Sequence, residues 1–189
     1  DAVNVDSLPL ADTTASSEMQ PDVDTMLAQM KEQLKDRPDD VRGWTLLANA
    51  LMGTARYAEA VEAYRVLISL QPDNPEILIR LADAIAMTQN GVLAGEVEQL
   101  ITRALALSPD QPQGLWLFGI AAEQRGKFDE ALMIFNRLLR MVANEPEVRI
   151  EVEAVIARIR QAQDQTPAID PAIEVKVDVP AELIASIRP

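Results

Sequence analysis

Residues 41–74 read VRGWTLLANALMGTARYAEAVEAYRVLISLQPDN, and the pattern of this stretch recurs twice further along the chain. Apolar or small side chains stand at offsets 4, 7, 8, 11, 20, 24 and 27 of this 34-residue unit, with proline at offset 32. Leu47 recurs as Leu81 after 34 residues, and Leu81 recurs as Phe118 after 37. One three-residue insertion in the second copy explains the difference. The chain therefore contains three copies of one structural unit.

Each unit is predicted to form two helices. Offsets 4, 7, 8 and 11 mark one face of a 3.6-residue period, and offsets 20, 24 and 27 mark a second. Small residues at offsets 8 and 20 let the paired helices approach closely, while large ones fill the space beside them. The small residues are Ala48, Ala82, Gly119, Ala60 and Ala131. This pattern resembles the tetratricopeptide repeat, and stacking is expected because one unit cannot bury its own apolar face.

The sequence predicts an all-α solenoid of three repeats with flanking helices. The expected helices span residues 23–35, 40–53, 57–70, 75–87, 94–107, 112–125, 128–141 and 146–163. Asp39 or Asp40 is expected to cap one helix, and Asn74 caps another that has Pro75 in its first turn. The first helix looks like the second half of a repeat, with Met26, Met30 and Gln33 at offsets 20, 24 and 27.

The two ends of the chain differ from the repeats. Residues 1–22 contain five acids and no base and are expected to be a disordered linker before a repeat domain at 23–163. The tail at 164–189 is β-prone, because apolar residues alternate with charged ones between Ile173 and Val179. A lone strand is not stable. The tail is expected either to be unstructured or to begin a β-containing domain missing from this sequence.

Composition restricts the possible functions. The net charge is −13, so nucleic acid is a poor partner and a basic protein or peptide a better one. Cysteine and histidine are absent, which excludes thiolate or histidine metal sites and histidine catalysis. We expect no cofactor and no enzyme. No segment is apolar enough to span a membrane. Because the chain begins at Asp1, any signal or anchor is expected upstream.

A second face of the first helix in each repeat carries the candidate binding residues. Offsets 5, 9 and 12 lie beside the packed face, and the tetratricopeptide resemblance implies that they line a concave groove. Trp116 would be a ligand contact there, or would instead pack under the last helix or the tail. Asp83 and Glu123 would attract lysines. The predicted groove residues are Arg42, Thr45, Asn49, Met52, Ile79, Arg80, Asp83, Met87, Trp116, Ile120 and Glu123.

A more specific resemblance covers about residues 23–183. The runs 38–47 (PDDVRGWTLL), 104–109 (ALALSP) and 115–122 (LWLFGIAA), together with the β-prone tail, are similar to the CcmI (CycH) family of cytochrome c maturation. The resemblance implies a periplasmic repeat domain, anchored through upstream membrane helices. It also implies a chaperone that holds the C-terminal helix of apocytochrome c and works with other maturation subunits. The alternative is a scaffold that assembles a membrane or haem-lyase complex, as in the NrfG type.

Overall fold

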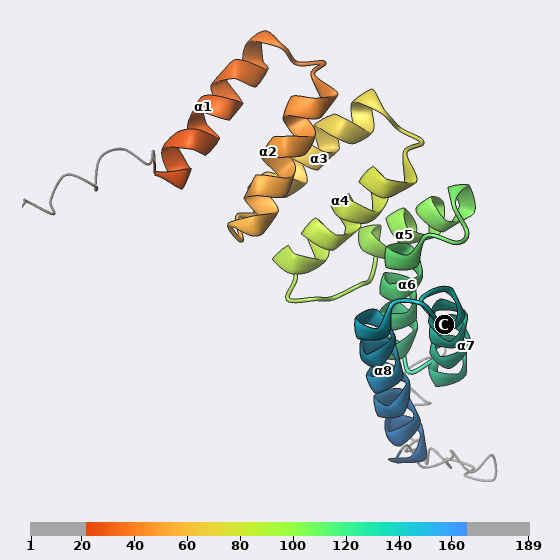
Figure 1. Ribbon diagram of the computed structural model, residues 1–189. Helices are drawn as coiled ribbons and strands as arrows, with labels where there is room; N and C mark the ends of the chain where they lie inside the picture. Colours follow the sequence, from red (N-terminus) through yellow and green to blue (C-terminus); the bar gives the residue numbers. More distant parts are fainter. Residues whose placement is uncertain (1–21, 166–189) are drawn as a thin grey trace, which may run out of the picture.

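The computed structural model describes residues 22–165, and this part of the chain is entirely helical. This range contains eight helices. Each lies beside the next and runs back along it, as Figure 1 shows. They are α1 (Val23–Asp36), α2 (Val41–Gly53), α3 (Tyr57–Leu70), α4 (Pro75–Thr88), α5 (Glu96–Leu107), α6 (Pro112–Gln124), α7 (Phe128–Met141) and α8 (Pro146–Gln165). Every bound lies within two residues of its predicted position. The predicted linker and most of the predicted tail lie outside the described residues.

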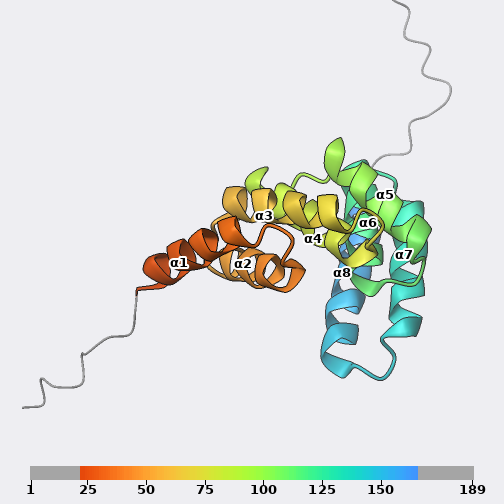
Figure 2. The ribbon, with the colours of Figure 1, turned by 90° about the horizontal axis from the view of Figure 1, so that it is seen from above.

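The closest packing is within the pairs α2–α3, α4–α5 and α6–α7, which are the three predicted repeats. Figures 1 and 2 show these pairs stacked in sequence order, with α1 beside α2 at one end and α8 beside α7 at the other. Stacking of this kind buries the apolar face that a single pair would leave open. The solenoid predicted from the repeat pattern is confirmed.

The core consists of the predicted packing positions. Tyr64 and Phe135, both at offset 24, are fully buried, and so are the small residues at offsets 8 and 20. A methyl group at Gly119 would lie 2.7 Å from the ring of Phe135, so glycine is what allows this close helix contact. The buried residues form two clusters that meet at α6: Leu117 and Ala121 belong to the first, and Leu115 and Ala122 to the second.

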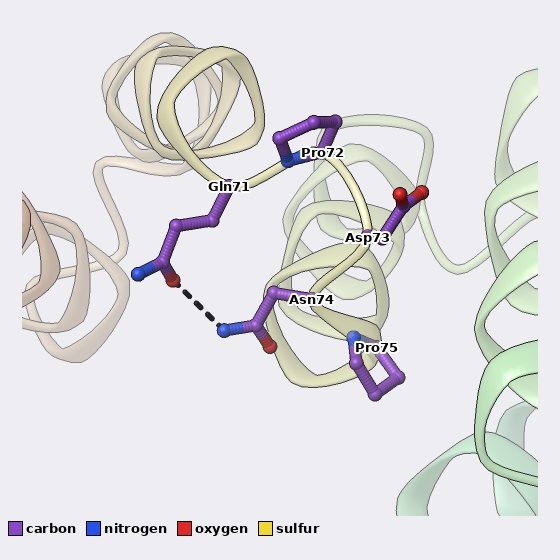
Figure 3. Close-up of a pocket in the computed structure, with 5 residues that line it drawn as sticks. All are labelled: Gln71, Pro72, Asp73, Asn74 and Pro75. Carbon is purple, nitrogen blue, oxygen red and sulfur yellow. Dashed lines mark hydrogen bonds between the residues drawn. The ribbon is translucent and has the colours of Figure 1, made fainter.

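Turn and cap residues explain where the helices begin. The Asp40 carboxylate accepts from the backbone N–H of Gly43 at 2.9 Å. The side-chain carbonyl of Asn74 accepts from the N–H groups of Glu76 and Ile77, as predicted. Figure 3 shows the Asn74 amide also donating to Gln71 at 2.9 Å. The corresponding residue before α6, Gln111, makes no such side-chain cap.

The three-residue insertion lies in the turn between α4 and α5. Asn90, Gly91 and Gly95 all have positive φ (55°, 82° and 65°), so the turn depends on residues that tolerate this conformation. Gln124, at the end of α6, binds the turn through the N–H of Leu93 and the carbonyl of Gly91. The insertion is therefore tied to the next repeat.

One packing expectation differs from the structure. In α1, Leu27 and Leu34 are buried, whereas Met26 and Gln33 are exposed and Met30 is half-buried. In a complete repeat, the first helix covers offsets 20, 24 and 27 of the second. The described residues contain no helix before α1 that could do so. α1 instead packs on α2 with the neighbouring face, where Leu34 lies against Gly43.

Candidate peptide-binding groove

The predicted groove residues lie on α2, α4 and α6, the first helices of the three pairs. α4 contacts α6 directly, and Arg158 reaches α6 from α8. The structure thus places these residues along one succession of helices, visible in Figure 1. Their side chains differ in how much surface they offer to a ligand.

The α2 part of the groove is polar. Asn49 is exposed, and its side-chain oxygen accepts from the hydroxyl of Tyr64 at 2.9 Å. Burial raises the pKa of Tyr64, with Arg80 acting in the opposite direction. Thr45 is half-buried and donates to the carbonyl of Val41, and Met52 is also half-buried. The repeat pattern predicts Tyr64, at offset 24, only as a packing residue. Its hydroxyl group needs a partner when the ring is buried, and that is the signal in the sequence for this contact.

Arg42 stands at the margin of this part. Its side chain is exposed and makes no hydrogen bond or ion pair with any residue between 22 and 165. Within residues 22–165, Arg42 is therefore a cation without an ion-pair partner, on a chain whose net charge is −13.

The α4 part contains one residue that does not fit the prediction. Ile79 is fully buried and lies against Gly114 at the start of α6, so its side chain offers no surface to a ligand. It belongs to the helix–helix contact. Arg80 is half-buried and donates to the carboxylate of Glu76 from two nitrogens, each at 3.2 Å. Met87, at the end of α4, is exposed.

Asp83 is the most unusual charged group of the groove. It is half-buried and takes part in no side-chain hydrogen bond or ion pair within the described part of the chain. Burial raises the pKa of this carboxyl group, and the positive charge of Arg80 partly offsets the effect. A carboxylate in this setting would gain from a cationic partner.

The α6 part is the most apolar. Trp116 is half-buried, and its indole meets the ring of Phe135 edge-on, with centroids 5.6 Å apart. Ile120, one turn further on, is half-buried as well. Trp116 packs against both core clusters and still retains accessible surface. Part of the indole is therefore core, and part remains available for contact.

Glu123 ends the α6 part and is already paired. The guanidinium of Arg158 donates to both of its carboxylate oxygens, at 3.0 and 2.7 Å. The pKa of Arg158 is raised, chiefly by its hydrogen bond to Glu123. Arg158 was not among the predicted site residues, since the sequence did not show which face of the last helix meets α6. Of the two acids predicted for the groove, Asp83 is thus the one without an ion-pair partner in residues 22–165.

Surface hollows also lie away from the predicted groove residues, on the described part of the chain. The hollow of about 500 Å³ in Figure 3 is lined by Gln71–Pro75, and the hydrogen bonds there belong to the helix cap. A more apolar hollow of about 380 Å³ lies between α5, α6 and α7 and includes Leu105, Phe118 and Met133. No set of three or more acidic side chains arranged to hold a metal ion occurs in residues 22–165. Within the same residues no helix is both long enough and apolar enough to cross a membrane.

The fold defines a tetratricopeptide-repeat protein. Its backbone is similar to the crystal structure of MamA, with a TM-score of 0.57, 16% identity, and coverage of 74% of this chain and 78% of that one. The family model for the "Cytochrome c-type biogenesis protein H TPR domain" matches residues 10–149. The chain belongs to this family.

Two curated relatives are consistent with that assignment. The cytochrome c-type biogenesis protein CycH of Bradyrhizobium diazoefficiens is 32% identical over 77% of this chain and 39% of its own length. A more distant relative is the formate-dependent nitrite reductase complex subunit NrfG of Escherichia coli O157:H7. NrfG is 20% identical to this chain, over 66% of this chain and 62% of the length of NrfG. The chain thus spans well under half of the CycH protein that it matches.

Proposed function

We propose that this repeat domain is a chaperone of apocytochrome c in the cytochrome c maturation system. It holds the C-terminal helix of apocytochrome c in the concave groove for haem ligation and performs no catalysis itself. Membership of the family supports a role in cytochrome c maturation. The observation that supports the binding site is the accessible part of the Trp116 side chain. The domain works in the periplasm, anchored to the inner membrane through upstream segments, and meets other maturation subunits there.

The chemistry of the groove suits an amphipathic helix. Such a helix lays its apolar stripe into an apolar groove through side chains spaced three and four residues apart. Trp116, Ile120 and Met87 provide apolar surface on adjacent helices. Asp83 and the net charge of −13 favour lysines beside that stripe.

The experiment is a calorimetric titration of the chain with two peptides from a c-type cytochrome. One peptide carries its C-terminal helix, and the other its CxxCH haem-attachment segment. We expect saturable binding of the first peptide and much weaker binding of the second. Tight binding of the CxxCH peptide alone would contradict the proposal.

A Trp116→Ala variant tests the location. We expect it to lose about 2 kcal/mol of affinity for the helical peptide, a typical loss for a buried aromatic anchor. Met133→Ala is the matched control, because Met133 is exposed on α7 and lies outside the groove. An unchanged affinity together with a lowered Tm would make Trp116 a core residue only.

A second candidate function is a scaffold for subunits of a membrane or haem-lyase complex. The apolar hollow between α5, α6 and α7 favours it, since Met133 at its rim is 68% exposed. The relative described as a nitrite reductase complex subunit points the same way. Met133→Glu would then impair co-purification of the complex, while leaving the affinity for the helical peptide unchanged.

A further inference from the structure

An exposed apolar face lies at the α1 end of the solenoid. Leu46 on α2 is 63% exposed, and Val23 and Met26 on α1 are 52% and 48% exposed. Large apolar side chains seldom gather in this way on a surface that faces water alone. We call these three residues, together with Met30 and Ala50, the α1–α2 face.

The α2 half of this face has a buried counterpart within the same molecule. Leu46 and Ala50 correspond to Leu117 and Ala121 of α6, 71 residues further on, which is one 34-residue and one 37-residue step. Leu117 and Ala121 are 9% and 1% exposed, and they belong to the cluster formed by the preceding helices, including α4. A leucine and an alanine at these two offsets are therefore buried in α6, where the first helix of the preceding repeat, α4, is present.

The α1 half shows the same relationship. In α3, α5 and α7, which are the second helices of the three pairs, the residues at offsets 20 and 24 are buried against the first helix of the same repeat. In α1, Met26 is exposed and Met30 only half-buried at these offsets. The buried counterparts are Ala60 and Tyr64 in α3, Val97 and Ile101 in α5, and Ala131 and Phe135 in α7.

Both halves border one position. The first helix of a preceding repeat would cover offsets 20 and 24 of α1. The same helix would also cover Leu46 and Ala50 of α2. α1 lies beside α2, as Figure 2 shows, and Leu34 of α1 meets α2 at Gly43. We propose that the α1–α2 face binds an amphipathic α-helix of a partner protein, in the place of a first helix that none of the residues 22–165 supplies.

Arg42 indicates the charge of this partner. It lies four residues before Leu46, one helical turn away on the same side of α2. Its guanidinium is exposed and forms no ion pair with another described residue. A helix that covers Leu46 would thus gain from a carboxylate opposite Arg42. This preference is opposite to that of the groove, where Asp83 favours a cation.

The residue types that precede α1 suit this position poorly. A first helix preceding α1 in the 34-residue register would have Leu10, Thr13, Thr14 and Ser17 at its packing positions. Three of these are hydroxyl residues, where α2 has Leu47, Ala48 and Leu51. A second copy is disfavoured by mutual repulsion, since each copy carries a net charge of −13. Neither residues 1–22 nor a second copy thus suits the face as well as an acidic helix of another polypeptide.

The test uses the whole chain and a defined probe. The probe is a peptide with the sequence of residues 75–88, the helix next to Leu117 and Ala121, held helical by a side-chain crosslink because so short a helix is marginal alone. We expect saturable binding that perturbs the NMR signals of Met26 and Leu46. Leu46→Glu should weaken it at least about tenfold, comparable to a single interface hot spot.

Three controls make the outcome specific. Met133→Glu places the same charge on an exposed residue of α7 and should leave probe binding unchanged. Arg42→Gln should weaken the binding of this acidic probe by about twofold to fivefold, the range of an exposed ion pair. Leu46→Glu should also leave cytochrome-peptide binding intact, so that failure of this site and failure of the groove are distinguishable.

Other results would overturn the proposal. Absence of probe binding at the α1–α2 face, in a wild-type chain shown to be folded by circular dichroism, would remove the site. A dimer seen by analytical ultracentrifugation and lost in Leu46→Glu would assign the face to a second copy. Probe binding that appears only after deletion of residues 1–21 would assign it to that segment.

Discussion

Gly119 illustrates how strictly single residues are constrained in this solenoid. Replacement of a helical glycine by alanine normally stabilises a helix by up to about 1 kcal/mol. At Gly119 the added methyl group would lie 2.7 Å from the fully buried ring of Phe135. At Gly53, the last residue of α2, it would meet no atom within 4 Å. The two positions therefore predict opposite results for one chemical change.

We expect Gly119→Ala to destabilise the domain by about 1–3 kcal/mol, as overpacking of a core does. Gly53→Ala should raise the free energy of unfolding slightly, by about 0.5 kcal/mol. Urea denaturation of both variants beside the wild type would measure this. Equal effects would mean that the α6–α7 contact is looser than described.

Asp83 predicts a pH dependence. Its folded-state pKa is raised above the ordinary value of 3.8 by burial, so the folded chain holds this proton more tightly than the unfolded chain. Stability from this group is therefore complete at low pH and is lost as pH rises from about 3.8 through the raised pKa. Asp83→Asn cannot ionise and should be free of that loss.

The stability of Asp83→Asn relative to wild type should increase between pH 4 and pH 7 in denaturation experiments. Asp36→Asn, at an exposed position of α1, is the control and should show a smaller change. A difference that stays flat or falls with pH would show that Asp83 is better solvated, or better paired, than its surroundings indicate.

At the scale of helices, the close contact within each pair depends on small residues. Ala60 of α3 is fully buried at offset 20, where the α2–α3 pair packs together. Ala60→Leu should cost about 1–3 kcal/mol in the free energy of unfolding. Ala58→Leu, at an exposed position of the same helix, should change it little. Thermal unfolding followed by circular dichroism compares the two, and equal Tm values would show that the assigned register is wrong.

The helices and their register could be predicted because the repeat presents each packing position three times. Burial of the groove residues could not be predicted in the same way. Ile79 and Trp116 both occupy offset 5, yet Ile79 is closed over by the start of α6 and Trp116 is not. The pairing of Glu123 with Arg158 likewise depends on how α8 docks, which periodicity alone does not determine. Neighbouring helices therefore decide which groove positions remain accessible.

For the molecule as a whole, net charge should affect the rate of association with a ligand more than the rate of dissociation. The net charge of −13 would attract a basic helix over distances longer than any contact. Association with the cytochrome peptide should slow markedly between low salt and about 0.5 M salt, whereas dissociation should change less. Stopped-flow fluorescence of the tryptophans measures both rates. If the association rate does not depend on salt, the net charge does not contribute to binding of the peptide.

The division of the core at α6 also bears on how the molecule opens. Cooperative units of a protein exchange their amide hydrogens with deuterium at rates set by the free energy of opening each unit. Because α6 contributes side chains to both clusters, its amides become exposed only when both have separated. α1 and α8 each contribute buried side chains to one cluster only and can detach without that cost. Protection should thus be greatest in the sixth of the eight helices, which also carries Trp116, so that the surface proposed to hold an unfolded client would be the last to unfold.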